Sequence, residues 1–563
     1  MLRFFRTSKL VTHFSKNNNF ILYFLFIIQA IIEVFSIFTI LLLINEILNV
    51  SNYELQEYFN FDRKTFIYVL TIFSIVIIII NFFLNLLINY KIINFSFKIY
   101  VDISSDLFNK FINSSYLGIS KYSFAFISSK ILNETRRLCE FVIIPYYIIV
   151  SKLFIFLIVT VGLLIYNWIV TLSALSIITS FFIVFYIFTR SKIATHGRLI
   201  SFYDKEILSI FSNSFFGFKD IKLNNLSLKN FHSFYLSQNK LSNVLKEVKF
   251  IASSARYGIE FFLFISLMII ILILNEYDSL NEKVFATIGF CLFIVLKMIP
   301  YFNAVYLNFS FWKSHYPSYE NINKLSNELD NVDAKFISTK KTLSNKIETL
   351  EIKNFKYRYL NTEANFEIND FNISKKGIIG VTGKSGSGKT TFLDIISGFI
   401  IPEKNNEGFF VNGIKLDENL KENYYKKISY VQQKIFLLGS TLKENIIFSE
   451  EIHEQKLQEV LELTKCDDFI DQKRLNQKIN LGRENLSGGQ IQRIGLARAL
   501  YKNPDILILD EATNALDENL EYEIINNIKN NFKESFIFVS THNPNILKIC
   551  DLLIKVKDRK IYI

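Results

Sequence analysis

Residues 383–390 read Gly383-Lys384-Ser385-Gly386-Ser387-Gly388-Lys389-Thr390, and this stretch decides the fold of the second half of the chain. The apolar run at 377–381 before it is typical of a buried strand, and residues 391–396 after it are typical of the start of a helix. Glycines between a strand and a helix allow successive backbone N–H groups to point inward, and the helix N-terminus favours an anion. The stretch therefore predicts a phosphate-binding loop.

A second apolar run, at 506–509, ends in the acids Asp510 and Glu511. A continuous apolar run is expected of a parallel strand covered on both faces, so the two acids should emerge at the sheet edge beside the phosphate loop. We expect Lys389 to reach the β- and γ-phosphates of ATP and the Thr390 hydroxyl to bind Mg²⁺. Asp510 is the expected Mg²⁺ partner, and Glu511 is the carboxylate expected to polarise the attacking water.

The motif Leu486-Ser487-Gly488-Gly489-Gln490 follows further along the chain. Residues 349–563 resemble the ATP-binding cassette (ABC) family, because this motif, the phosphate loop and several others occur in the family's order. The resemblance implies that Gln433 touches Mg²⁺ and water. It also implies that His542, which follows an apolar strand, contacts the γ-phosphate.

Three positions depart from the common pattern of the family. Gln432 stands where many relatives have proline, and Asn514 replaces the commoner serine in the loop 514–517, which crosses the dimer in the family. Exporter relatives have a longer loop, rich in glycine and acids, where this chain has only residues 481–485. The short loop puts in doubt its contact with the membrane helices but not the binding of ATP.

The predicted ATP site draws on residues from the whole cassette. The expected catalytic residues are Glu511, His542 and Gln433, and the expected Mg²⁺ ligands are Thr390, Gln433 and Asp510. The expected contacts with ATP are Tyr359, Gly383, Lys384, Ser385, Gly386, Ser387, Gly388, Lys389, Thr390, Thr391, Ser487, Gly488, Gly489 and Gln490. The resemblance implies that Tyr359 stacks on the adenine, with Tyr357 as the less favoured choice.

The chain carries one phosphate loop and one Leu-Ser-Gly-Gly-Gln motif. In the ABC family this motif closes over ATP held by the phosphate loop of another cassette, so the resemblance implies that one chain does not complete a site. Because Lys389, Asp510, Glu511 and His542 are all present, we expect a homodimer with two equivalent sites. A heterodimer with a second half-transporter stays open.

Apolar runs dominate the first half of the chain. Those near 20–44, 65–89, 141–164, 168–189, 251–274 and 284–311 approach or exceed the about 20 residues that cross a bilayer as a helix. The first run is too long for the core of a secretion signal, so we expect it to be retained. The sequence predicts a multidomain membrane protein, with an all-α six-helix ABC exporter transmembrane domain at 1–312, a polar linker at 313–348 and an α/β P-loop ATPase domain at 349–563.

The charges of the loops predict the orientation in the membrane. Lys and Arg precede the first span and populate 90–138 and 190–250, whereas acids concentrate at 45–64 and 275–283. By the positive-inside rule, the N-terminus and the ATPase domain are then cytoplasmic. This asymmetry and anionic membrane lipid explain the net charge of +11, so no nucleic-acid partner is expected. The abundance of Ile, Asn, Lys and Phe suggests an AT-rich bacterial genome, and therefore the bacterial inner (cytoplasmic) membrane.

The two basic segments, 90–138 and 190–250, are too long for loops and contain almost no Pro or Gly. We expect the membrane helices to continue through them into the cytosol. Short coupling helices that dock on the ATPase are expected at the turning points near 117–121 and 222–225. This arrangement resembles the exporter class of the ABC family.

Polar residues inside the spans are candidates for contact with a cargo, because a charge in hydrocarbon is costly and normally faces a cavity or a partner. The candidates are Glu33, Asn81, Asn85 and Lys297. For Glu33 and Lys297 a structural role is equally open. Arg256 and Glu260 are spaced i, i+4, which favours a structural ion pair over a ligand site.

The segments 32–35, 256–260 and 297–300 look like those of bacterial flippases for lipid-linked oligosaccharides. This resemblance implies an amphiphilic or lipid-linked cargo that is exported or flipped. A peptide or drug exporter of the same architecture is the alternative. Fewer than about 20 residues precede the first span, so no peptidase domain is expected there, which counts against exporters that cleave their own peptide cargo.

Two other function classes fit the sequence less well. A cassette ATPase that serves DNA repair or translation lacks fused membrane spans. A channel or receptor that ATP only gates does not need efficient hydrolysis, so the presence of Glu511 counts against this class. Cys139, Cys291, Cys466 and Cys550 have no paired spacing, which indicates neither a disulfide framework nor a zinc site.

Overall fold

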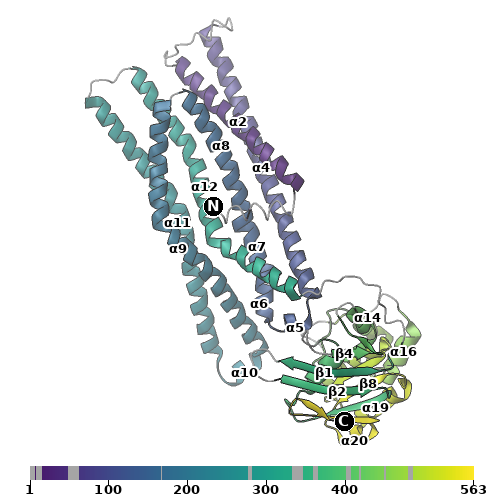
Figure 1. The fold of residues 1–563 in the computed structure, drawn as a ribbon. Coiled ribbons are helices and arrows are strands. Elements are labelled where there is room, and N and C mark those ends of the chain that lie inside the picture. Colours follow the sequence, from purple (N-terminus) through teal and green to yellow (C-terminus); the bar gives the residue numbers. More distant parts are fainter. Residues whose placement is uncertain are drawn as a thin grey trace. The chain divides into compact units, whose positions relative to one another are not determined.

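The computed structural model describes residues 7, 16–47, 62–166, 168–276, 282–332, 346–358, 365–400, 408–417, 420–448, 452–479 and 486–562. The chain divides into two compact units (Figure 1). The helical unit comprises Met1–Ser114 and Ser120–Val332, and the sheet unit comprises Ser115–Ile119 and Asp333–Ile563. Each unit is described below by itself.

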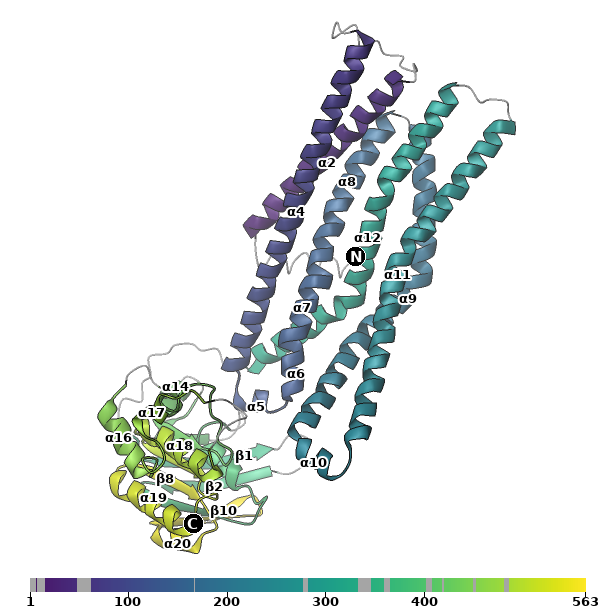
Figure 2. The same ribbon diagram turned by 180° about the vertical axis from the view of Figure 1, so that it is seen from behind.

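Six long helices build the part of the helical unit that the structure describes. They are α2 (Lys16–Ile47), α4 (Arg63–Asn113), α8 (Ile144–Tyr166), α9 (Trp168–Phe216), α11 (Ser227–Glu276) and α12 (Glu282–Val332). Each covers one of the six predicted apolar spans. Helix α2 packs on α4 and α8, α9 pairs with α11, and α12 packs on α8, α9 and α11 (Figures 1 and 2).

The length and composition of these helices suit a bilayer. Among the described residues, the stretches Asn19–Ile40, Lys64–Asn113 and Phe124–Ile165 are long and apolar enough to cross a membrane. Helix α4 leaves large apolar side chains exposed, among them Ile72, Ile79 and Phe83, as expected of a surface that faces lipid. The chain is a multi-pass membrane protein. Because α4 has 51 residues and thus a length of about 75 Å, it extends well beyond the hydrocarbon layer, as predicted.

Helix α12 corrects the predicted linker. Residues 313–332, expected in the polar linker at 313–348, continue the helix to Val332. Ile322, Leu325 and Leu329, spaced three and four residues apart, are buried along this extension, and so are Ser314 and Ser318. Asn323, Lys324 and Asn327 are exposed. The composition alone concealed this helical spacing.

Short elements connect the long helices. They are α5 (Tyr116–Ile119), α6 (Phe124–Ser128), the π-helical turn η1 (Ser129–Glu134), α7 (Thr135–Leu138), the π-helical turn η2 (Cys139–Ile143) and α10 (Phe218–Leu223). Helices α5 and α10 lie at the two predicted turning points. No residue of α10 is buried, so its docking on an ATPase stays a prediction.

A polar cluster ties η1, α7, η2, α9 and α12 together beyond the apolar spans. Arg137 forms an ion pair with Asp204, and the ring of His315 stacks on Phe141 with centroids 4.3 Å apart. Burial, as the largest cause, lowers the pKa of His315 to about 4, and the nearby charge of Arg137 adds to this effect. His315 is therefore neutral at physiological pH.

The sheet unit contains a ten-stranded sheet with the order β5-β4-β1-β2-β10-β9-β3-β8-β7-β6. The strands are β1 (Leu350–Arg358), β2 (Asn365–Ile373), β3 (Gly377–Thr382), β4 (Gly408–Val411), β5 (Ile414–Lys415), β6 (Ile428–Val431), β7 (Ile506–Asp510), β8 (Phe536–Ser540), β9 (Leu552–Lys557) and β10 (Lys560–Tyr562). Strands β3, β8, β7 and β6 are parallel neighbours. Their carboxyl ends therefore meet at one edge of the sheet.

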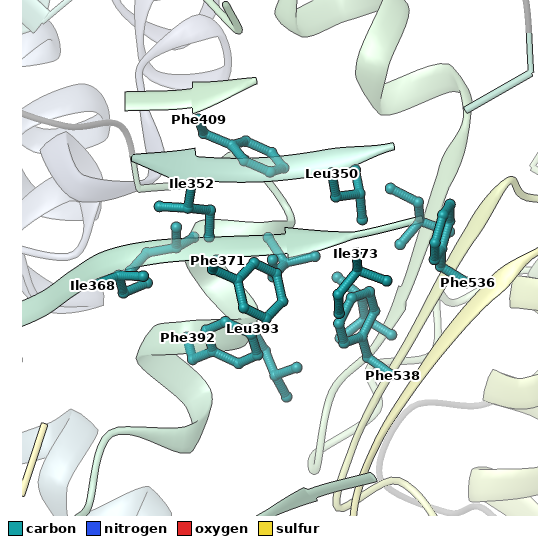
Figure 3. Packing of buried hydrophobic residues seen from close by; sticks show 14 of the residues in the cluster. Leu350, Ile352, Ile368, Phe371, Ile373, Phe392, Leu393, Phe409, Phe536 and Phe538 are labelled. Carbon is teal, nitrogen blue, oxygen red and sulfur yellow. The ribbon is translucent and has the colours of Figure 1, made fainter. Parts of the chain in front are cut away.

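Helices cover the sheet. They are α13 (Lys389–Ile396), α14 (Lys421–Lys426), α15 (Leu442–Ile446), α16 (Glu454–Leu463), α17 (Gln472–Leu475), α18 (Gly488–Tyr501), α19 (Glu518–Asn531) and α20 (Pro544–Ile549). Figure 3 shows the apolar core in which Phe392 of α13 meets Phe371 and Phe538 edge to face. Every residue of β7 is buried, as its apolar run predicts. This packing fixes α13 and the end of β7 against each other.

Candidate functional site

The phosphate loop has the predicted context, since β3 ends at Thr382 and α13 begins at Lys389. Gly388 precedes α13 with φ of 107°, a conformation that glycine adopts without strain. A Cβ on Gly383 would lie 2.3 Å from the carbonyl oxygen of Val556, so the close approach of two backbones requires glycine there. Lys384, Ser385 and Gly386 are exposed at the tip of the loop. The loop is therefore a tight backbone turn that is open to a ligand.

Ser387 provides a test of whether the loop fits a phosphate. Its hydroxyl is buried and has no hydrogen-bond partner among the described residues. A buried polar atom without a partner is costly, and a phosphate oxygen is a suitable acceptor for that hydroxyl. The loop thus offers a hydroxyl, a helix N-terminus and the side chain of Lys389 to one anion.

Lys389 is the point where three segments of the chain meet. Its amino group donates to the carbonyl oxygen of Gly383 at 3.0 Å and lies 2.8 Å from Nε2 of His542. The same nitrogen is 3.7 Å from Oε1 of Glu511. The side chain of Lys389 is only 7% exposed, so these contacts hold its charge inside the loop. The structure therefore brings together Glu511 and His542, which the sequence predicts as catalytic residues, and Lys389, which it predicts to contact the phosphates of ATP.

Glu511 follows β7 directly and has φ of 51°, the left-handed region that few residues other than glycine adopt. Its Oε2 accepts hydrogen bonds from the side-chain amides of Gln433 at 2.9 Å and Asn514 at 3.2 Å. The side chain is 24% exposed. The carboxylate is thus oriented by two amides and one cation and remains accessible to water.

Asp510 is buried at the end of β7. Its Oδ2 accepts a hydrogen bond from the hydroxyl of Tyr430 at 3.3 Å, and its carboxyl is also hydrogen-bonded to the side chain of Thr390. Burial raises the pKa of Asp510 above its usual value. The two oxygen-bearing residues predicted to bind Mg²⁺, Thr390 and Asp510, are therefore adjacent, as a hard cation with oxygen ligands requires.

Tyr430 and Asp394 were not predicted as site residues. Tyr430 lies on β6, next to β7, and its hydroxyl bonds to Asp394 as well as to Asp510. Burial raises the pKa of Asp394 to about 7. The available signal was weak, because a tyrosine within an apolar strand is normally interpreted as a core residue.

The motif at 486–490 begins α18. The hydroxyl of Ser487 accepts a hydrogen bond from the backbone N–H of Gln490, and the Gln490 side chain accepts one from the N–H of Ser487. This capping box fixes the first turn, while Ser487 and Gly488 are exposed. A Cβ on Gly489 would lie 3.0 Å from the carbonyl oxygen of Ala515, so the motif packs tightly on the loop 514–517.

Two predicted features lie outside the described residues. They are Tyr359, expected to stack on adenine, and the short loop at 481–485. The less favoured candidate for the adenine contact, Tyr357 on β1, is partly buried and packs against the apolar core. The structure therefore leaves the adenine contact as a prediction.

In the helical unit, the predicted residues Glu33, Asn81 and Asn85 form one buried polar network. Glu33 is 1% exposed, and its carboxylate accepts hydrogen bonds from the amide of Asn81 and the hydroxyl of Tyr301. The amide of Asn85 donates to the backbone carbonyl of Asn81 at 2.9 Å. Glu33 therefore links three helices, α2, α4 and α12.

The network extends to α8, where Ser151 donates to the side-chain oxygen of Gln29 at 3.2 Å and Lys152 lies 5.5 Å from the ring centroid of Tyr301. Elsewhere, Arg256 and Glu260 form the expected i, i+4 ion pair at 2.8 Å. The side chain of Lys297 lies outside the described residues. The polar candidates on α2 and α4 therefore form hydrogen bonds with one another inside the helical unit.

Comparison with known proteins agrees with this site. Residues 366–514 match the family model described as ABC transporter. The cassette is an ABC transporter domain. Its phosphate loop, its Leu-Ser-Gly-Gly-Gln motif and the acids Asp510 and Glu511 all lie within the matched range.

Two curated relatives illustrate what this chain is similar to. It is 34% identical over 213 residues to a putative export ATP-binding/permease protein of Rickettsia bellii, covering 36% of each chain. It is 34% identical over 210 residues to the alpha-hemolysin translocation ATP-binding protein HlyB of Escherichia coli O157:H7, covering 36% of this chain and 29% of that protein. The matches thus span about a third of these relatives.

A solved structure extends the likeness in fold to almost the whole chain. A bacterial Atm1-family ABC exporter with ATP bound superimposes with a TM-score of 0.77, covering 96% of this chain and 93% of its own, at 12% identity. The chain has the architecture of an ABC exporter half-transporter, with a helical membrane unit followed by one ATPase domain.

Proposed function

We propose that this chain is one half of an ATP-driven exporter that couples the hydrolysis of ATP to the movement of a cargo across the membrane. The observation that carries the proposal is the arrangement of Glu511, held by Gln433 and Lys389 at the sheet edge where the phosphate loop opens. A structural ion pair does not need a carboxylate in a left-handed backbone conformation beside a buried lysine and a phosphate loop.

The chemistry follows from the positions of these groups. Lys389 and the backbone of the loop neutralise the β- and γ-phosphates of ATP, so the γ-phosphate competes with Glu511 and His542 for the lysine. Glu511 polarises a water and accepts its proton while the water oxygen attacks the γ-phosphorus, the bond from the γ-phosphorus to the bridging oxygen breaks, and ADP leaves. Gln433 keeps the carboxylate of Glu511 oriented during this step.

Thr390 and Asp510 are the residues that fit Mg²⁺, with Gln433 as a third candidate. The hydroxyl of Thr390 and the carboxylate of Asp510 provide the oxygen ligands that this ion prefers, and they are already hydrogen-bonded to each other. Bound there with ATP, the ion neutralises charge on the phosphates. The oxygen atoms of these side chains are the reason for placing Mg²⁺ there.

We propose a homodimer as the working unit. Ser487 and Gly488 are exposed at the N-terminus of the 14-residue helix α18, which is suited to an anion, and their described contacts do not include Lys389 or Glu511. A second copy of the chain would offer its phosphate loop and ATP to this helix terminus. A heterodimer with a related half-transporter is the alternative, and the same site chemistry applies to it.

We further propose that the N-terminus and the ATPase domain lie on the cytoplasmic side of a bacterial inner membrane. The excess of Lys and Arg before the first span and in the segments 90–138 and 190–250 supports this orientation. Helix α10, with Phe218 and Leu223 exposed, supports a contact with a second copy, since a six-residue helix with exposed apolar side chains is unstable alone in water.

The cargo that we propose is amphiphilic, in the class of lipid-linked oligosaccharides or other lipids. The resemblance of the segments around Glu33, Arg256 and Lys297 to those of flippases supports it. The relatives named for the translocation of alpha-hemolysin and the secretion of colicin V favour a peptide or protein as the second candidate.

The test is transport by the purified protein in proteoliposomes. A panel of labelled lipid-linked glycans, phospholipids and peptides is scored for ATP-dependent movement, with Glu511→Gln as the hydrolysis-deficient control. Movement of a lipid-linked glycan that Glu511→Gln abolishes supports the proposal. If only peptides move, the cargo is a peptide or protein, which is the second candidate. If ATP is hydrolysed but no compound of the panel moves, the assignment of a lipid cargo is wrong.

A further inference from the structure

Helix α5 is part of the sheet unit although it lies between α4 and α6 in the chain. The ring of Tyr116 stacks on Phe399, with centroids 5.2 Å apart and planes at 29°. Leu117 packs against the apolar core of the same unit, and Gly118 is buried. A short segment that adjoins the first half of the chain is therefore anchored beside the helix of the phosphate loop.

Phe399 connects this anchor to the interior of the ATPase domain. Its backbone N–H donates to the carbonyl oxygen of Asp394 at 3.0 Å, so it is fixed to the end of α13, the helix that begins at Lys389. Its ring also contacts Tyr430, with centroids 6.0 Å apart. A single ring, that of Phe399, therefore lies between Tyr116 and Tyr430 and contacts both.

Tyr430 completes the connection. Its hydroxyl donates to Oδ2 of Asp510 at 3.3 Å, and Asp510 is hydrogen-bonded to Thr390. The same hydroxyl also bonds to Asp394, so the phenol lies between two carboxyl groups, and its bond to Asp510 favours one orientation of that carboxylate. Four contacts thus run without a break from Tyr116 to the residues assigned to Mg²⁺.

We propose that Tyr430 is a positioning residue that orients Asp510 for Mg²⁺, and that Tyr116 acts on the same carboxylate through Phe399 and Tyr430. The inference rests on the proposed function only in assigning Mg²⁺ to Asp510. In the alternative, the rings are ordinary core packing whose loss lowers stability without changing the demand for the ion. Contiguity alone does not distinguish the two, so the test has to measure coupling.

The experiment measures how much Mg²⁺ the full-length purified protein needs. At a fixed ATP concentration, the rise in melting temperature is followed while Mg²⁺ is titrated, and the rise caused by ATP in EDTA is measured in parallel. ATP hydrolysis over the same titration gives a second readout. The variants are Tyr430→Phe, which removes only the hydroxyl, and Tyr116→Ala, which removes the stacked ring.

Tyr430→Phe is expected to raise the Mg²⁺ concentration at half-effect by about tenfold, as for the loss of a hydrogen bond to a charged group, while binding of ATP in EDTA changes less than about twofold. Tyr116→Ala is expected to raise it by about threefold, and Tyr116→Phe, which keeps the stack, to leave it unchanged. In the Tyr430→Phe background, Tyr116→Ala should add nothing, because the two changes act through one bond.

An unchanged Mg²⁺ requirement in Tyr430→Phe overturns the positioning role, and additive effects of the two changes overturn the connection to Tyr116. Both phenylalanine variants keep a ring of nearly the same volume, so the fold is preserved. The proposed function is tested separately by Lys389→Ala. If that variant hydrolyses ATP normally, the ATP site itself is misassigned, whereas a dead Lys389→Ala beside a normal Tyr430→Phe removes this inference alone.

Discussion

The amino group of Lys389 lies 2.8 Å from Nε2 of His542, although 153 positions separate the two residues in the chain. An ammonium group only donates hydrogen bonds, so Nε2 of His542 is the acceptor and the ring proton is on Nδ1. His542 and Glu511 hold the lysine at the mouth of the phosphate loop. A γ-phosphate that enters the loop meets all three side chains at once.

Lys389→Ala is expected to lower ATP hydrolysis by about 100-fold or more, because it removes the cation that the loop offers to the β- and γ-phosphates. Release of phosphate at saturating Mg-ATP measures the effect. Lys375→Ala, which alters an exposed lysine before β3, is the matched control and should stay within about twofold. Normal turnover in Lys389→Ala would falsify the assignment of residues 383–390.

His542→Ala is expected to bind ATP normally and to lose about 100-fold in hydrolysis, since its ring contacts the phosphate end of the site. The ATP-dependent rise in melting temperature reports binding, and phosphate release reports hydrolysis. The exposed His232 on α11 provides the control variant, His232→Ala. If binding and hydrolysis fall together, His542 has a structural role in shaping the loop around Lys389.

Glu511→Gln keeps the size of the side chain and its hydrogen bonds but removes the charge that polarises water. We expect ATP to bind, the dimer to close and hydrolysis to fall by about 100-fold or more. Cysteines at Ser487 of one copy and Ser385 of the other should cross-link in the presence of Mg-ATP and stay apart without it. Glu518→Gln, an exposed acid at the start of α19, is the control. Cross-linking without ATP, or full turnover in Glu511→Gln, contradicts the mechanism.

His315 makes the stability of the helical unit depend on pH. The pKa of His315 is about 4 in the fold, below the ordinary histidine pKa of 6.5, so the unfolded chain binds more protons between these values. The contribution, about 3 kcal/mol, is fully present above pH 6.5 and is lost as the pH falls toward 4. Melting temperature between pH 7.5 and 5 should fall less steeply in His315→Gln than in the parent. Equal slopes would show that Arg137 and Glu134, which face His315, rearrange to accept its charge.

Glu33→Ala is expected to destabilise the helical unit by about 2–3 kcal/mol, because it leaves the amide of Asn81 and the hydroxyl of Tyr301 without their buried acceptor. Glu33→Gln keeps an acceptor and should cost less. The control is Glu260→Gln, which breaks an exposed ion pair and should cost at most about 0.5 kcal/mol. Thermal unfolding in detergent distinguishes these cases. Stability unchanged in Glu33→Ala, with transport lost, would instead place Glu33 in the path of the cargo.

Local patterns were sufficient for the phosphate loop and its acids. A strand, a glycine turn and a helix adjoin in the sequence around Gly388, and the burial of β7 follows from its continuous apolar run, so Asp510 and Glu511 were predicted at the correct edge. The six long helices were predicted for the same reason, since each apolar run is self-contained.

Long-range contacts were not accessible from the sequence. Tyr301 meets Glu33 from 268 positions away, and nothing near either residue indicates the other. Tyr430 has the pattern of a core residue until β6 is placed next to β7. The extension of α12 past residue 312 was missed because Lys, Asn and Ser are frequent in this segment, although Ile322, Leu325 and Leu329 follow helical spacing.

The network around Glu33 also bears on how the protein is made. The ribosome delivers α2 well before α4 and long before α12, so the carboxylate reaches the lipid when neither Asn81 nor Tyr301 exists as a partner. A lone acid near the centre of a helix costs about 2.5–3.5 kcal/mol on insertion, which lowers the fraction of nascent chains whose first helix enters the bilayer alone. Insertion of α2 therefore becomes more favourable once α4 arrives beside it, and a chain truncated before α12 lacks the hydroxyl of Tyr301 that completes the partners of Glu33.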